Sequence, residues 1–189
     1  MDARALEGGF SDAALASSAA FRAALDAMAR PGRILPIHGA TPPHPLSIAA
    51  GTLLLTLCDQ GTPVFLAPSV DLPMIRDWMI FHTGAPLSTP EDAMFALGRW
   101  EELLPLDRYA IGTSEYPDRS ATLIVECDTL ASAGTRLRGP GIADVAELQL
   151  PETEPFLRNA ALFPLGLDFM FTAGSELAAL PRTTRVEAA

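Results

Sequence analysis

The chain has 189 residues, of which 49% are apolar and 19% charged, and its formal net charge is −10. This length is most simply one domain spanning residues 1–189, and it is long enough to bury a core. The acidic balance excludes sequence-independent nucleic-acid binding, which needs a basic surface. Because soluble monomers rarely expose large apolar patches, we expect part of the apolar surplus to lie at subunit contacts.

The first predicted helix follows Ser17, a residue type that caps helices. Its apolar residues Phe21, Leu25 and Met28 recur at helical spacing, which predicts one apolar face. The helix ends at Pro31-Gly32, because proline and glycine stop helices.

The most apolar run of the chain, residues 46–58, predicts a second helix. A bilayer-spanning helix needs about 20 apolar residues, so this shorter run indicates a buried core helix and no membrane span. A short buried strand is predicted at 63–67, and a third helix at 72–83 ends at Gly84.

The second half of the chain predicts strands that alternate with short helical segments. The best strand is 121–127, a β-branched run without helical period. Helices that come first and then interleave with strands favour an α/β fold with a mixed sheet flanked by helices. The other predicted segments are strands at 93–97, 167–172 and 177–180, an extended segment at 135–138, a helical turn at 101–107 and a helix at 152–161 with Pro155 in its first turn.

The absence of lysine closes off several mechanisms, since all thirteen basic residues are arginine. A pyridoxal phosphate enzyme forms its internal Schiff base on a lysine, and a P-loop needs a lysine at the phosphates. No GxGxxG follows a predicted strand, and residues 112–116 match only the first three positions of a GxSxG elbow. The motifs of these enzyme classes are therefore absent from the sequence.

The histidines and cysteines have no ligand-type spacing, so no metal site is predicted within one chain. His38 and His44 lie in a proline-rich loop, and His82 is interpreted as a helix-end residue packed near aromatic neighbours. Cys58 and Cys127 are interpreted as small core residues in a reducing compartment. The first residues do not resemble a signal peptide, and we expect a cytoplasmic protein.

Arg136 and Arg138 form the most interesting candidate site. In an extended strand, side chains two positions apart share a face, so two guanidinium groups converge beside the turn at Gly139 and Gly141. Such a group can hold a phosphate or a partner carboxylate. The alternative is an edge strand whose arginines pair with nearby acids, such as Asp144 or Glu126.

Arg182 and Arg185, near the C-terminus, are candidates for the same two roles, which are contact with an anion or a partner carboxylate, or pairing with nearby acids of this chain. Asp168 lies in an apolar predicted strand, where an unpaired charge is expensive to bury. We expect its carboxylate to accept hydrogen bonds from backbone amides or from one of these arginines.

The chain resembles the PhnH family of the bacterial carbon–phosphorus lyase system over nearly its whole length. Each motif alone is weak, but their joint order is specific. The motifs are FRAALDAMARPG at 21–32, LLLTLCDQGTPVFL at 53–66, FHTGAPL at 81–87, RLRGPGI at 136–142, FPLGLDFMFTAG at 163–174 and LPRTTRVE at 180–187.

The resemblance implies a fold similar to the large domain of pyridoxal-phosphate-dependent transferases, but without that cofactor or any other. It implies a homodimer when alone, and a complex with the PhnG, PhnI and PhnJ subunits. That complex transfers an alkylphosphonate to the ribose C1 of ATP and releases adenine, giving an α-D-ribose 1-alkylphosphonate 5-triphosphate in organic phosphonate catabolism.

Two functions remain open at this point. One is a non-catalytic subunit of that transferase complex, with no independent activity. The other is a nucleotide- or phosphonate-binding subunit that uses the arginine and glycine turn as an anion site.

Overall fold

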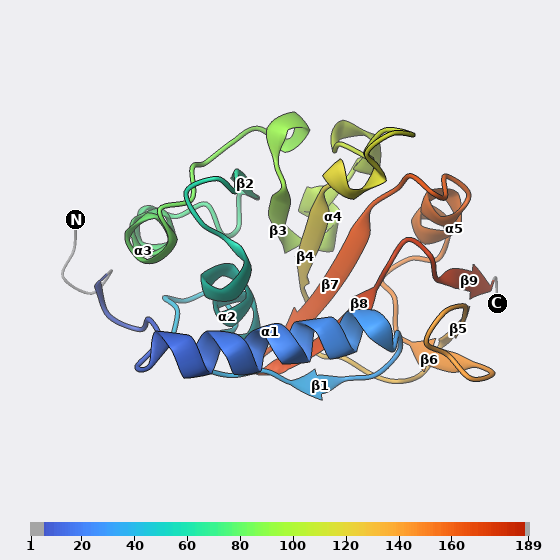
Figure 1. Cartoon of the computed structure of the whole chain (residues 1–189), viewed down its shortest axis with the longest axis horizontal. Coiled ribbons are helices and arrows are strands. Elements are labelled where there is room, and N and C mark those ends of the chain that lie inside the picture. The colour runs from blue at the N-terminus through green and yellow to red at the C-terminus, as the bar shows by residue number, and fades with distance from the viewer. Residues whose placement is uncertain (1–5, 188–189) are drawn as a thin grey trace.

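The computed structural model describes residues 6–187, which form an α/β fold with a mixed sheet flanked by helices (Figure 1). This confirms the predicted fold class. The main sheet has six strands in the order β1-β8-β7-β4-β3-β2. Their bounds are β1 Leu35–Pro36, β2 Val64–Leu66, β3 Phe95–Arg99, β4 Thr122–Glu126, β7 Asp168–Ala173 and β8 Glu176–Leu180.

The central strands of this sheet are parallel and buried. β2, β3, β4 and β7 run parallel, whereas β8 and then β1 add antiparallel at one edge. Leu123, Ile124 and Val125 of β4 are 0% exposed. Parallel strands covered on both faces read as continuous apolar runs, which is why 121–127 was predicted so clearly.

The first helix, α1, spans Ala13–Ala29 and begins five residues earlier than predicted. Its N-cap is Asp12, whose carboxylate accepts a hydrogen bond from the Leu15 amide at 3.1 Å, and the predicted cap Ser17 lies inside the helix. The predicted apolar face is also wrong, because Phe21 and Leu25 are 47% and 54% exposed.

The buried face of α1 consists of three alanines, Ala20, Ala24 and Ala27. α1 packs against α2 and β8. Small side chains allow this close approach, whereas large ones there would overpack the contact. The larger apolar side chains are consequently left on the outer face.

The next two helices match the sequence prediction. α2 spans Ile48–Leu57 with Ser47 as its N-cap, and α3 spans Pro73–Thr83. α3 ends at Gly84, whose φ of 70° is the left-handed conformation that glycine accepts easily. α2 is buried over most of its length, as expected for a core helix.

An aromatic cluster joins the short helices α4 (Trp100–Leu103) and α5 (Glu154–Ala160) to β7. Phe169 and Phe171, two positions apart on β7, lie on the same face of the sheet. Trp100 stacks on Phe156 of α5 at 4.8 Å between ring centroids, and Phe156 meets Phe169 edge-on at 4.9 Å. This cluster brings α5 onto the sheet.

A second sheet of three antiparallel strands was missed in part by the sequence analysis. Its order is β6-β5-β9, with bounds β5 Thr135–Arg138, β6 Ala146–Leu148 and β9 Arg185–Glu187. Only β5 was predicted as extended. β1, β6 and β9 have two or three residues each, which is too short for a period of two to be visible.

The ion pair between Asp168 and Arg182 connects three parts of the fold. Both side chains are largely buried, with 15% and 13% exposed. The Asp168 carboxylate also accepts from the Arg182 backbone amide at 2.8 Å. The Arg182 guanidinium donates further to the Pro117 carbonyl and the Ser120 hydroxyl. The expectation that Asp168 accepts from backbone amides or from one of the arginines is confirmed, and both kinds of donor are present.

Removing the arginine of this pair should destabilise the protein strongly. We expect Arg182→Ala to lower the free energy of unfolding by about 3–5 kcal/mol, because it leaves a buried carboxylate without its partner. Urea unfolding followed by circular dichroism measures this. The matched control is Arg99→Ala, whose pair with Asp128 is exposed and contributes at most about 1 kcal/mol. Equal effects of the two substitutions would contradict the assignment.

Candidate functional site

β5 presents Arg136 and Arg138 on one face, as predicted, but acidic neighbours already occupy both. The Glu187 carboxylate on β9 forms ion pairs with both arginines. The distance from Arg136 Nε to Oε2 is 3.5 Å, and that from Arg138 Nε to Oε1 is 2.6 Å. Arg138 also pairs with Asp144 at 2.9 Å. These pairs raise the pKa of the Arg138 guanidinium. The expected alternative of pairing with nearby acids therefore describes this cluster better than an open anion site, although β5 is the central strand of its sheet and not an edge strand.

The acids of this cluster were predicted only in part. Asp144 was named in advance, but Glu126 lies elsewhere, and Glu187 was not considered. The register of β5 and β9 places Arg136 opposite Glu187 and Arg138 opposite Arg185. Sequence spacing cannot show a cross-strand partner 49 residues away.

The glycine turn beside these arginines is packed against the rest of the chain. Gly139 and Gly141 have φ of 138° and 80°. A side chain at Gly141 would place its Cβ 1.8 Å from the Ala29 carbonyl oxygen at the end of α1. At Gly139 the Cβ would lie 3.1 Å from the Thr183 carbonyl oxygen. The turn thus serves close backbone packing at both glycines.

Arg182 does not join Arg136 and Arg138. Its guanidinium is held by Asp168 at the beginning of β7, as described above. The three candidate arginines therefore belong to two separate ion-pair clusters.

His82 lies where the sequence placed it, at the last turn of α3 among aromatic rings. Its ring meets Trp78 at 5.2 Å and Phe81 at 4.9 Å between centroids, both edge-on. Its Nε2 is 3.4 Å from the Glu7 carbonyl oxygen. Within residues 6–187, no group of three or more His, Cys, Asp or Glu side chains could hold a metal ion.

The two thiols are poor nucleophiles at neutral pH. Cys58 is buried, and desolvation raises its pKa to about 12. Cys127 is half-buried, and desolvation raises its pKa to about 11. Since the thiolate is the reactive form, both side chains are mostly inert.

Glu126, at the end of β4, is a partly buried carboxylate that was expected only as a possible partner of Arg136 and Arg138. Its oxygens accept from the Ser47 amide at 2.8 Å and from the Thr172 hydroxyl at 3.0 Å. Desolvation raises its pKa despite these hydrogen bonds. An acidic residue within the apolar strand ATLIVEC was the signal that could have identified it.

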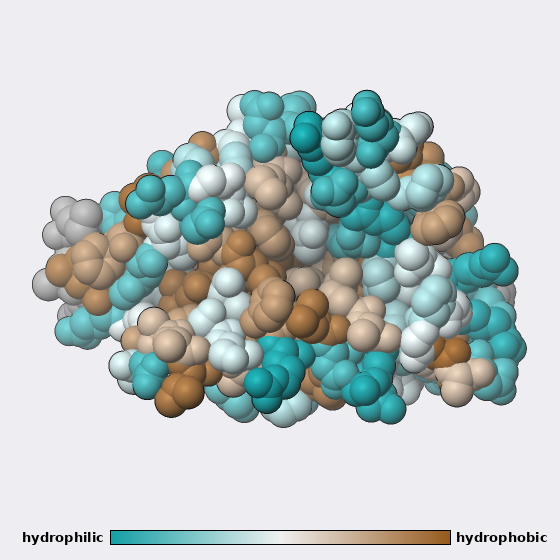
Figure 2. Space-filling model, viewed as in Figure 1, coloured by the Kyte–Doolittle hydropathy of each residue, from teal (hydrophilic) through white to brown (hydrophobic). Residues whose placement is uncertain are grey.

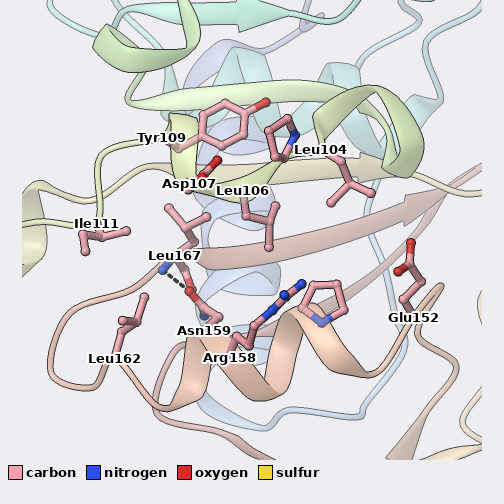
Figure 3. Close-up of a pocket in the computed structure, with 12 residues that line it drawn as sticks. Leu104, Leu106, Asp107, Tyr109, Ile111, Glu152, Arg158, Asn159, Leu162 and Leu167 are labelled. Atoms are coloured by element: carbon pink, nitrogen blue, oxygen red, sulfur yellow. Dashed lines mark hydrogen bonds between the residues drawn. The ribbon is translucent and has the colours of Figure 1, made fainter.

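A pocket of about 690 Å³ opens between the 104–111 segment and α5 (Figure 3). Most of its lining is apolar, and its size falls in the range of small-ligand pockets. The side-chain amide of Asn159 makes two hydrogen bonds with the Leu167 backbone. It donates to the Leu167 carbonyl at 2.9 Å and accepts from the Leu167 amide at 2.8 Å. The lining residues are Leu104, Pro105, Leu106, Asp107, Tyr109, Ile111, Glu152, Pro155, Arg158, Asn159, Leu162 and Leu167.

The sequence analysis missed this pocket because its walls come from two segments about 50 residues apart. Arg108 stabilises one wall by donating to the Glu102 carbonyl at 2.6 Å and to the Tyr109 hydroxyl at 3.0 Å. Its guanidinium also lies 5.2 Å from the Phe65 ring centroid and 5.1 Å from that of Tyr109. No sequence motif encodes such an arrangement.

None of the helices within residues 6–187 is both long and apolar enough to span a membrane. This agrees with the reading of 46–58 as a core helix.

Comparisons with known proteins identify relatives over almost the full chain. A family model described as "Bacterial phosphonate metabolism protein (PhnH)" matches residues 8–187. The alpha-D-ribose 1-methylphosphonate 5-triphosphate synthase subunit PhnH of Rhizobium meliloti (strain 1021) is 40% identical over 189 residues, covering 95% of this chain and 94% of its own. The putative C-P lyase subunit protein HtxG of Stutzerimonas stutzeri is 30% identical over 173 residues, covering 88% and 84%.

Gly141 should be far more sensitive to substitution than a glycine in open space. We expect Gly141→Ala to lower the free energy of unfolding by about 1–3 kcal/mol more than Gly174→Ala. Both glycines have positive φ, but a Cβ at Gly174 meets no atom within 4 Å. Thermal and urea unfolding of both variants tests this difference. Equal stabilities would show that the turn does not pack on the end of α1.

Glu126 predicts a pH-dependent stability. Burial raises the pKa of the Glu126 carboxyl in the folded state. The contribution of Glu126 to the free energy of unfolding is therefore complete below its unfolded pKa, where the carboxyl is protonated, and is lost as pH rises through its folded pKa. Glu126→Gln keeps an acceptor for Ser47 and carries no charge. We expect its stability relative to the unsubstituted chain to increase between pH 5 and pH 8, by about 1.4 kcal/mol per unit of pKa shift. Glu101→Gln, at an exposed position, is the control, and a flat difference over this range would contradict the prediction.

Proposed function

Because this chain belongs to the PhnH family of bacterial phosphonate metabolism proteins, we propose that it is a subunit of an α-D-ribose 1-methylphosphonate 5-triphosphate synthase. The observation that carries the proposal is 40% identity, over 95% of the chain, to a protein named as that subunit. The proposed complex transfers an alkylphosphonate to the ribose C1 of ATP, with release of adenine. This chain acts in it as a non-catalytic subunit in the cytoplasm.

The state of the reactive side chains supports a non-catalytic role. Burial keeps both thiols protonated at neutral pH, and His82 is packed among aromatic rings. The arginines that could bind a nucleotide or phosphonate are engaged by Glu187, Asp144 and Asp168. An anion could bind there only by displacing these carboxylates. We therefore favour a partner contact over an anion site for Arg136 and Arg138.

The outer face of α1 supports a role in association. Leu15, Phe21 and Leu25 are 72%, 47% and 54% exposed on this helix. Figure 2 shows hydrophobic side chains reaching the surface over the region of α1 and α2. Exposed apolar patches of this kind mark interaction sites. The partners we propose are the PhnG, PhnI and PhnJ subunits, with a homodimer when the chain is alone.

The architecture supports a common fold with the large domain of pyridoxal-phosphate-dependent transferases, with the cofactor lost. The parallel strands β2, β3, β4 and β7, followed by the antiparallel β8, form its sheet. The sequence has no lysine that could form the Schiff base. One buried core cluster extends from Ala20 to Val186, which supports a single domain.

The α1 face provides the test of the proposed function. When the tagged chain is co-expressed with PhnG, PhnI and PhnJ, we expect all four proteins to co-purify. Phe21→Asp combined with Leu25→Asp should weaken this association, or the homodimer of the isolated chain, by about tenfold or more. Size-exclusion chromatography with mass measurement reports both species.

The control for this experiment is Met94→Asp, a substitution at a 50% exposed residue outside α1. Both variants should unfold at similar temperatures, because each replaced residue is about half exposed. Failure of the unsubstituted chain to co-purify would contradict the proposed function. Full assembly by the α1 variant would contradict only the role of α1.

A further inference from the structure

The pocket between the 104–111 segment and α5 has an apolar interior that continues onto the surface. Leu104, Leu106 and Ile111 from one segment face Leu162 and Leu167 from the other (Figure 3). Leu162 is 44% exposed, and the adjacent Phe163 is 59% exposed. An occupant that covers this apolar rim must be larger than the pocket itself, which points to a macromolecule.

The charges at the opening select the chemistry of the occupant. Asp107 and Glu152 line the pocket and form no salt bridge with any residue of the described chain. Glu152 only accepts from the Trp100 indole at 2.8 Å, which leaves its charge uncompensated. Arg158 is 4.0 Å from Glu154. Two carboxylates thus accompany one guanidinium among the lining residues, which gives the opening a small net negative charge that favours a basic group over an anion.

Arg158 supplies a donor in the middle of this opening. Its side chain is 71% exposed and lies between Glu152 at one end of the pocket and Leu162 at the other (Figure 3). A peptide backbone carbonyl can accept from this guanidinium. An apolar side chain can then enter between Leu106 and Leu162, while a neighbouring basic side chain reaches Glu152 or Asp107.

We propose that this pocket binds a segment of a partner subunit in which an apolar anchor residue is flanked by lysine or arginine. This inference rests on the proposed function, because it needs a partner subunit. It goes beyond that function by assigning a second docking site, away from α1, and the sequence chemistry that this site selects. Buried apolar anchors carry much of the binding energy at interfaces, and flanking charges add specificity.

The test uses the chain co-expressed with PhnG, PhnI and PhnJ. Leu162→Asp places a charge on the apolar wall, and Asp107→Arg reverses the charge at the opening. We expect each to weaken association of at least one partner by about tenfold. Met94→Asp is the control for Leu162→Asp, and Asp118→Arg, on the exposed 117–119 turn, is the control for Asp107→Arg. Both controls should assemble like the unsubstituted chain.

Photo-crosslinking identifies the bound segment. With p-benzoylphenylalanine in place of Leu162, mass spectrometry of the crosslinked complex should find a partner peptide with an apolar residue and a lysine or arginine within about three positions. Unaltered assembly by Leu162→Asp and Asp107→Arg, or crosslinks to an acidic segment, would overturn the inference and leave the proposed function standing. If the unsubstituted chain assembles with none of the three subunits, both proposals fail.

Discussion

The buried pair of Asp168 and Arg182 is the interaction on which the C-terminal third depends. It fixes the beginning of β7 and, through the Pro117 carbonyl and Ser120 hydroxyl, the turn that precedes β4. The chain that leaves Arg182 passes Gly139 and becomes β9, which pairs with β5. The anchored Arg182 thus precedes by a few residues the strand from which Glu187 reaches Arg136 and Arg138. Burial of both charges makes this pair intolerant of losing one member.

Two of the exposed apolar surfaces carry the proposed contacts. The outer face of α1 exposes large apolar side chains, whereas the pocket beside α5 combines an apolar interior with an acidic opening. In Figure 1, α1 lies along the lower edge and α5 at the upper right, so the two surfaces belong to different parts of the molecule. A subunit with two such surfaces can contact two neighbours at once, which suits a component of a larger assembly.

Sequence patterns were most accurate where one local signal dominates. The strand 122–126, the helix 48–57 and the helix that ends at Gly84 were all predicted within one or two residues. The face of α1 was wrong for an identifiable reason. The prediction assumed that the large apolar side chains at helical spacing form the buried face. In the structure, alanines form the buried face that packs against α2 and β8. Among the site residues, the partners of Asp168 were predicted correctly, whereas the contacts of Glu126 and the pocket were not predicted.

By itself, the sequence determined the class of fold, the order of the major elements, the lack of a lysine for Schiff-base chemistry and, through its ordered motifs, the family. These features depend on residues close together along the chain or on composition. Only the tertiary structure decided that Glu187 occupies Arg136 and Arg138, that Phe21 and Leu25 face outward, and that two distant segments enclose a pocket. Each of these depends on strand register and helix packing, and such distances in space are not encoded by spacing along the chain.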